Sequence, residues 1–158
     1  MAENKVNIPH VIAAVSAFVG LVLLVVGLAT PGWTTEGGLP EGGPGAIQAT
    51  RGFIVFGTLN LVFGVIFSVT QTIKKPVVNP AKCAALMIAG GILSDIGAAI
   101  FTGYQLITFP GVPFGYSFYM YLTWAQTIFS IGGGVIILLE ERKVTEEDVA
   151  NVRALNKP

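Results

Sequence analysis

The chain has 158 residues, which is enough material for about one domain. Hydrophobic residues make up 53% of it and charged residues only 11%, whereas an average soluble domain is about 25% charged. The formal net charge is zero, so no basic excess indicates nucleic-acid binding, and the single cysteine, Cys83, excludes a disulfide within the chain.

Four long apolar runs follow one another along the sequence, at about residues 10–30, 52–72, 83–109 and 116–139. Each run is long enough to cross a hydrocarbon core of about 30 Å as a helix. With an even number of crossings, every Lys and Arg except Arg51 falls on one side, and positive residues favour the cytosolic side. We therefore predict an all-α membrane protein, a four-helix bundle with up-down-up-down topology and both termini in the cytosol.

The first run begins after Pro9 and ends at Pro31-Gly32. Its apolar stretch is longer than the core of a typical signal peptide, so we expect a retained helix. Trp33 follows at the position of an interfacial aromatic residue. Residues 31–51 then form the first outer loop, in which Gly and Pro are frequent. The Lys-Ser/Thr pair of a phosphate-binding loop is missing, which favours a flexible connection.

The connections after the second run are short. The inner loop, residues 73–82, carries Lys74, Lys75 and Lys82, which mark the cytosolic side and could contact anionic lipid. Cys83 follows directly, and a cysteine next to the membrane surface is either a lipidation point or a small buried thiol.

Prolines and glycines in residues 110–115 predict a tight outer turn. Residues 140–158 form a cytosolic tail, in which residues 145–155 are expected to make a small separate helix, because Thr145 and Asp148 have capping-box spacing.

Asp95 is the only acidic side chain inside a run, near the middle of the third. An isolated charge at that depth costs about 2.5 to 3.5 kcal/mol on insertion scales, so it must face protein or water. Asn60 and Gln126 lie near the middle of the second and fourth runs. We predict that the three side chains form one intramembrane polar cluster. Hydrogen bonding between helices, contact with a partner, and a proton or cation site all remain open for Asp95.

Small residues recur at helical spacing in each run and predict close helix packing. The glycines expected to allow it are Gly20, Gly27, Gly57, Gly64, Gly91 and Gly133. Aromatic residues crowd the outer end of the fourth run, which indicates membrane anchoring together with a contact surface for a partner. The residues expected on that surface are Trp33, Phe114, Tyr116, Tyr119 and Trp124.

Catalysis finds little support in the sequence. His10 is the only histidine, and no cysteine or carboxylate cluster lies near it. A metal site needs more ligands, and a Ser-His-Asp arrangement would join residues at different membrane depths. We expect no catalytic residue, no metal, no cofactor and no small-molecule substrate.

Three segments together resemble the claudin and peripheral myelin protein superfamily. Gly27-Leu28-Ala29-Thr30-Pro31-Gly32-Trp33 resembles its first span, which ends before an outer Trp. Residues 82–97, with Gly90-Gly91-Ile92-Leu93, are similar to its third span. Residues 114–134, from the aromatic-Gly-x-Ser motif through Trp124 to three consecutive glycines, resemble its fourth. The chain departs from claudins in its short first outer loop, which lacks the Gly-Leu-Trp signature and the cysteine pair, and in its C-terminal residues, which are unlike a PDZ-binding tail.

The resemblance implies a non-enzymatic, multi-pass protein of the plasma membrane that contacts lipid and either a membrane-protein partner or further copies of itself. Because the outer loop is short, we expect first a structural or auxiliary subunit that packs laterally with a channel, receptor or larger complex. A cell-cell junction protein that forms homo-oligomers is the alternative. A tetraspan of the MARVEL type is a third reading on topology alone. A small ion- or proton-coupled transporter that uses Asp95 is the alternative of another class.

Overall fold

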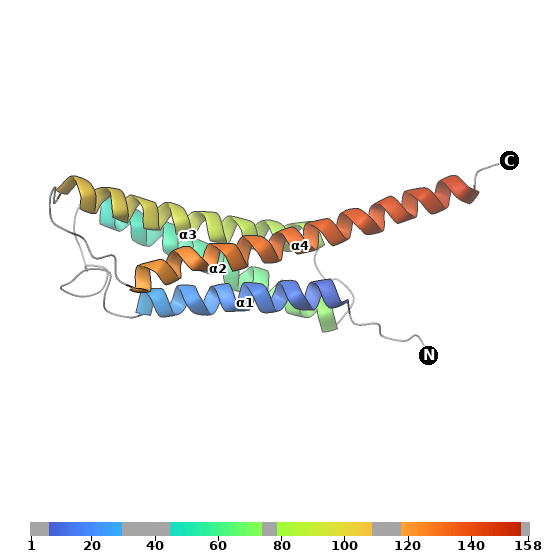
Figure 1. The fold of residues 1–158 in the computed structure, drawn as a ribbon, viewed down its shortest axis with the longest axis horizontal. Helices are drawn as coiled ribbons and strands as arrows, with labels where there is room; N and C mark the ends of the chain where they lie inside the picture. The colour runs from blue at the N-terminus through green and yellow to red at the C-terminus, as the bar shows by residue number, and fades with distance from the viewer. Residues whose placement is uncertain (1–6, 30–44, 74–78, 109–117, 156–158) are drawn as a thin grey trace.

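The computed structural model describes residues 7–29, 45–73, 79–108 and 118–155, which form four α-helices (Figure 1). They are α1 (Ile8–Ala29), α2 (Gly45–Ile73), α3 (Pro80–Thr108) and α4 (Phe118–Leu155). The shortest, α1, has 22 residues and therefore extends ~33 Å at 1.5 Å per residue. All four helices are long and apolar enough to cross a membrane. The prediction of an all-helical chain with four spanning helices is confirmed to this extent, and it indicates an integral multi-pass membrane protein.

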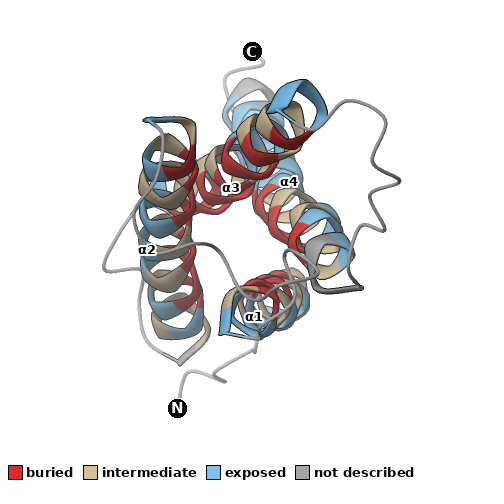
Figure 2. Ribbon diagram, turned by 90° about the vertical axis from the view of Figure 1, so that its left-hand side faces the viewer, coloured by how far each residue is buried: buried red, intermediate tan, exposed pale blue. Residues whose placement is uncertain are grey.

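The four helices pack as a bundle in which α2 lies beside α3, α3 beside α4, and α1 beside both α4 and α2 (Figure 2). Neighbouring helices run in opposite directions, because Gly57 of α2 lies against Ser94 of α3 while Gly64 lies against Met87. The α3–α4 contact is also antiparallel, because Gly91 lies near Ser130 and Ala84 lies near Gly134. The α1–α4 contact is antiparallel too, because Gly20 lies near Ser130 and Ala13 lies near Gly133.

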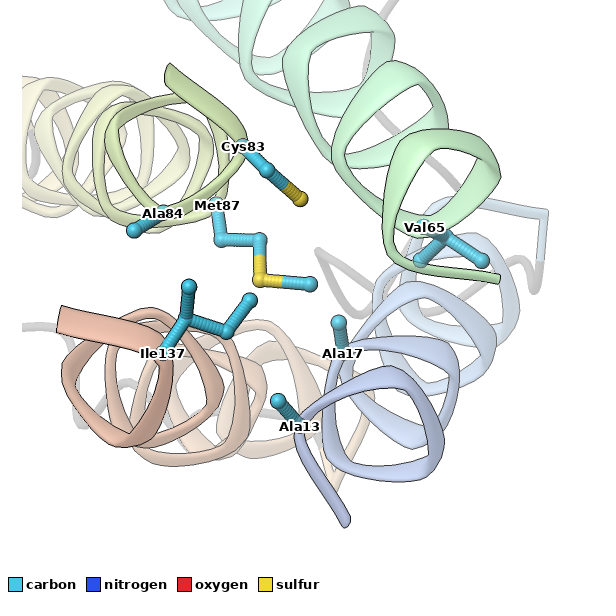
Figure 3. Close-up of a cluster of buried hydrophobic side chains, with 7 residues drawn as sticks. All are labelled: Ala13, Ala17, Val65, Cys83, Ala84, Met87 and Ile137. Carbon is cyan, nitrogen blue, oxygen red and sulfur yellow. The ribbon is translucent and has the colours of Figure 1, made fainter. Parts of the chain in front are cut away.

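Small and medium-sized apolar side chains fill the interior of the bundle. Figure 3 shows Met87 of α3 and Ile137 of α4 pointing toward one another beside Ala17 of α1. The full cluster comprises Ala13, Ala17, Val65, Cys83, Ala84, Met87 and Ile137. A second cluster continues the interior toward the opposite end, with Leu24, Ile54, Leu61 and Phe101.

Large apolar side chains line the outside of the bundle. Figure 2 shows that the exposed residues lie on the outer sides of the helices and the buried ones face inward. Phe18, Phe56 and Phe63 are about half exposed, and Ile128 is 75% exposed. In water such a surface would be a liability, whereas lipid tails are as apolar as leucine. Burial of apolar area therefore does not hold these helices together, and close contact between small residues has to do so.

The helix α2 begins at Gly45, whereas residues 45–51 were expected to belong to the first outer loop. The reason is tertiary packing. Ile47 and Thr50 are buried, and the backbone oxygen of Thr50 lies against Gly97 of α3. Arg51, which was assigned to that loop, accordingly lies inside the helix.

The helix α4 continues without a break to Leu155, so the expected separate helix at residues 145–155 is wrong. The Thr145 hydroxyl donates to the backbone oxygen of Glu141 one turn earlier, which is an interior helix position and not a cap. No Gly or Pro interrupts residues 135–155, and Arg142 pairs with Glu146 at 2.8 Å. The last part of α4 projects beyond the other helices (Figure 1). Every side chain described in residues 142–155 is exposed.

Candidate functional site

Small residues bring α1, α3 and α4 together around one point on α4. A Cβ atom added to Gly91 of α3 would lie 3.3 Å from the Ser130 Cβ, and one added to Gly20 of α1 would lie 2.8 Å from the Ser130 Oγ. Ser130 and Gln126, one turn apart on α4, are both completely buried at this point. The close approach of the two neighbouring helices thus encloses a pair of polar side chains.

These two side chains begin a chain of hydrogen bonds that ends on Asp95. The Ser130 Oγ lies 2.8 Å from the Gln126 Oε1, to which it can donate. The Gln126 Nε2 donates to the Thr127 Oγ1 at 3.0 Å, and that hydroxyl donates to the Asp95 Oδ1 at 2.6 Å. The chain of hydrogen bonds therefore follows α4 from the contact with α1 and crosses to α3 at its last bond, from Thr127 to Asp95.

Asp95 joins α3 to α4 through the bond from Thr127, and its side chain is only partly buried. Within the described part of the chain, no donor reaches the second carboxylate oxygen, Oδ2. Asp95 stands halfway along α3, so this oxygen is at the depth where a membrane is driest. The prediction that Asp95 must face protein or water is met for one of its two oxygens.

Exposed apolar side chains stand near Asp95 and Thr127 on both helices. Ile92 and Ile96 of α3 are 46% and 39% exposed, and Trp124 and Ile128 of α4 are 41% and 75% exposed. Ile92 and Trp124 lie three positions before Asp95 and Thr127 and therefore share their side of each helix. Ile96 and Ile128 lie one position after them, about 100° further around the helix. We call this surface the Asp95 face; it consists of Ile92, Asp95, Ile96, Trp124, Thr127 and Ile128.

Asn60 does not belong to the polar cluster, contrary to the prediction. Its Nδ2 donates to the backbone oxygen of Phe56 in its own helix at 2.8 Å, and no hydrogen bond among the described residues joins it to Asp95 or Gln126. The buried position that follows Gly57 on α2 is taken by Leu61, which is fully buried, whereas Asn60 is partly exposed. A shift of one residue rotates a side chain by about 100° around a helix, which is enough to move it off the packed side.

Thr127 was missed as a functional residue, although it is the side chain that contacts Asp95. Its sequence signal is weak, because threonine is common in apolar helices and lies beside the more conspicuous Gln126. Three close-packing glycines were missed as well. Gly90, Gly97 and Gly134 would each place a Cβ atom 2.7 Å from a side chain of the neighbouring helix. The spacing of Gly90, Ser94 and Gly97 could have indicated two of them.

The six glycines predicted to allow close packing are all buried: Gly20, Gly27, Gly57, Gly64, Gly91 and Gly133. The partner surface predicted from aromatic residues can be placed only in part. Trp33, Phe114 and Tyr116 lie outside the described residues, and Tyr119 is described only as part of the first turn of α4. Trp124 is exposed and belongs to the Asp95 face.

Cys83 lies inside the bundle, where its thiol approaches the backbone oxygen of Gly64 at 3.3 Å (Figure 3). The side chain is fully buried, so an acylating enzyme could not reach it while the helices are packed. The alternative of a small buried thiol therefore replaces lipidation. Among the described residues, no three His, Cys, Asp or Glu side chains gather to hold a metal ion.

The chain was compared with protein-family models and with curated proteins. No family model matches it, and no curated protein matches it.

Proposed function

We propose that this chain is a non-enzymatic membrane subunit that packs laterally against another membrane protein through the Asp95 face. The observation that carries the proposal is the Asp95 carboxyl group, which is only partly buried at mid-span and whose Oδ2 has no hydrogen-bond donor among the described residues. In a hydrocarbon environment a polar group without a partner costs several kcal/mol, because no water is there to replace one. A neighbouring helix that supplies a donor at this depth removes the cost.

The rest of the Asp95 face supports packing against a helix. Four exposed apolar side chains, from two helices, belong to this face and can contact the partner. Polar contacts between membrane helices give direction and register, while packing of the surrounding atoms gives most of the attraction. The partner that fits has an apolar helix with Arg, Lys, or a hydroxyl or amide side chain near its middle.

The orientation in the membrane follows from charge. Lys82 at the start of α3, together with Arg142 and Lys143 of α4, lies at one end of the bundle, and Arg51 lies toward the other. Because positive residues are enriched on the cytosolic side, the end with Lys82 is cytosolic, and so are both chain termini. Location in the plasma membrane rests on the resemblance to the claudin and peripheral myelin protein superfamily alone.

Within that superfamily, the auxiliary-subunit role fits the Asp95 face better than the junction role. Lateral packing uses the spans, which are the part of the chain that carries the partly exposed Asp95. Transport is disfavoured by the course of the hydrogen bonds. They join Asp95 to residues 126, 127 and 130, which lie within about one turn of α4 (~6 Å along the helix), so they do not provide a path across a hydrocarbon core of about 30 Å.

The test is co-purification from the native membrane in mild detergent, followed by mass spectrometry of the intact complex. The wild-type chain should carry a second membrane protein in fixed stoichiometry, and Asp95→Leu should lose it. Asn60→Leu is the matched control, because Asn60 lies near the same depth and bonds only within its own helix. It should retain the partner. The Asp95→Leu bundle should remain folded, since a single hydrogen bond between membrane helices contributes only about 0.6 kcal/mol.

Other outcomes separate the remaining functions. Recovery of this chain alone, as oligomers that Asp95→Leu dissolves, would replace the hetero-partner with a second copy and favour the junction protein. Recovery of a monomer from wild-type membranes would contradict the proposal. Asp95-dependent ion or proton flux in vesicles that contain only this chain would assign the protein to transport instead.

A further inference from the structure

An apolar groove lies on the outer side of the α2–α3 contact, at the end of the bundle where Lys82 lies. It has a volume of about 470 Å³ and is lined by Phe67 of α2 and by Lys82, Ala85, Leu86 and Ala89 of α3. Ala85 and Ala89 are one turn apart on the same side of α3, and their methyl groups leave a low strip between the larger Phe67 and Leu86. The groove thus exists because two small residues stand between bulky ones.

The chemistry of the groove is asymmetric along the helix. Lys82 is its only polar side chain, it is exposed, and it stands in the first turn of α3. From Lys82 to Ala89 the groove extends ~10 Å along the helix at 1.5 Å per residue, away from the cytosolic surface and into the apolar layer. The occupant that fits therefore has an anionic group at the membrane surface and an apolar chain below it.

The helix N-terminus itself does not compete for that anion. The Asn79 side chain accepts from the backbone N–H of Ala81 at 2.8 Å, and the Asn79 backbone oxygen accepts from the N–H groups of Lys82 and Cys83. These three donors are already satisfied, so an anion at this end of α3 would be recognised by the Lys82 ammonium group. Lys74 and Lys75, close in sequence, add positive charge to the same connection.

We propose that this groove binds an anionic phospholipid of the cytosolic leaflet, with one acyl chain along Ala85 and Ala89 and the phosphate paired with Lys82. A partner helix is a poorer occupant, because a groove of about two turns ends before a spanning helix would. The site does not depend on the proposed function, since it lies at the α2–α3 contact and the Asp95 face lies at the α3–α4 contact.

The test uses photoactivatable lipid probes. The full chain is placed in phosphatidylcholine vesicles that contain a trace of phosphatidylserine or phosphatidylcholine with a diazirine on the acyl chain, and the labelled residues are mapped by mass spectrometry. The phosphatidylserine probe should label residues 82–89 and Phe67 in preference to other exposed residues. Lys82→Gln should lower that preference about fivefold, the equivalent of about 1 kcal/mol. Lys143→Gln, which changes an exposed lysine on the projecting part of α4, should leave it unchanged.

A second variant distinguishes the contribution of the groove's shape from that of the Lys82 charge. Ala85→Phe fills the low strip from an exposed position, so it should reduce labelling by both probes while the bundle stays folded. Even labelling of all exposed apolar residues, unchanged by Lys82→Gln, would show ordinary boundary lipid and overturn the proposal. A photocrosslink from residues 85–89 to a second protein chain would overturn it as well, because protein would then cover the groove.

Discussion

The two faces of α3 are packed by different means. Toward α2 it presents backbone and small side chains: a Cβ atom on Gly90 would lie 2.9 Å from the Gly57 backbone oxygen, and one on Gly97 would lie 3.0 Å from that of Thr50. Toward α4 the contact includes the hydrogen bond from Thr127 to Asp95 and the polar side chains that continue from it. At Gly57, Gly90 and Gly97 the first interface leaves no room for an added methyl group, whereas the second includes a carboxyl group that is only partly buried.

The difference shows how a small membrane bundle can divide its tasks. Close backbone contact brings many atoms into van der Waals contact, an attraction that does not depend on the hydrophobic effect. The α2–α3 interface therefore holds the two helices together. A polar chain contributes less energy, since hydrogen bonds between membrane helices average about 0.6 kcal/mol. The α3–α4 interface therefore gains little stability from the Asp95 hydrogen bond.

The largest effect is expected from Gly57→Ala, which tests cohesion at the α2–α3 interface. The added methyl group would meet the backbone oxygen of Gly90 at 2.8 Å and the backbone nitrogen of Ser94 at 2.9 Å, so the helices must separate. The free energy of unfolding should fall by about 1–3 kcal/mol, as for other overpacked sites. Gly52→Ala in the same helix meets nothing within 4 Å and should be neutral or stabilising.

Unfolding in mixed micelles with increasing denaturing detergent, followed by circular dichroism or proteolysis, measures both variants. Equal stability of the Gly57 and Gly52 variants would show that α2 and α3 are not in backbone contact.

A smaller effect is expected from Gln126→Leu, which interrupts the polar chain. The change removes the bonds to Ser130 and Thr127, but Ser130 keeps the Gln126 backbone oxygen at 2.8 Å and Thr127 keeps Asp95. Because Gln126 is fully buried, the free energy of unfolding should fall by about 0.5–1.5 kcal/mol. Asn60→Leu should change stability by less than about 0.5 kcal/mol, because Asn60 is partly exposed and bonds to the backbone of its own helix. If the two variants were equally destabilised, Asn60 would belong to the polar cluster after all.

The smallest effect on the bundle is expected from Val149→Pro, in the projecting part of α4. A proline inside a helix removes a backbone hydrogen bond and clashes with the preceding turn, so helical content should fall. Val149 lies among exposed residues beyond the other helices, so the detergent concentration that unfolds the bundle should not change. A drop in that concentration would mean that the projecting part contacts the bundle or the membrane surface.

The sequence alone determined that there are four helices and approximately where they lie. In lipid, the backbone N–H and C=O groups of such an apolar run are all hydrogen-bonded only if the run forms a helix, so its secondary structure follows from its length and composition. The inward position of the small residues also followed from helical spacing, since glycines such as Gly57 and Gly64 recur on one side. The sequence patterns for helix ends failed in two places. Residues 45–51 are helical because they pack against α3, and the helix continues after Leu139 because no Gly or Pro interrupts it.

Only the tertiary structure decided which polar residues meet. Asp95, Asn60 and Gln126 share a depth, but contact also depends on how each helix is rotated about its axis. That rotation is set by the sum of all packed pairs along the interface. The closely packed glycines turned α2 so that Leu61 faces inward and Asn60 does not, and turned α4 so that Thr127 reaches Asp95. One residue along a helix is a rotation of about 100°, a difference that a sequence pattern of mixed small and apolar residues does not resolve.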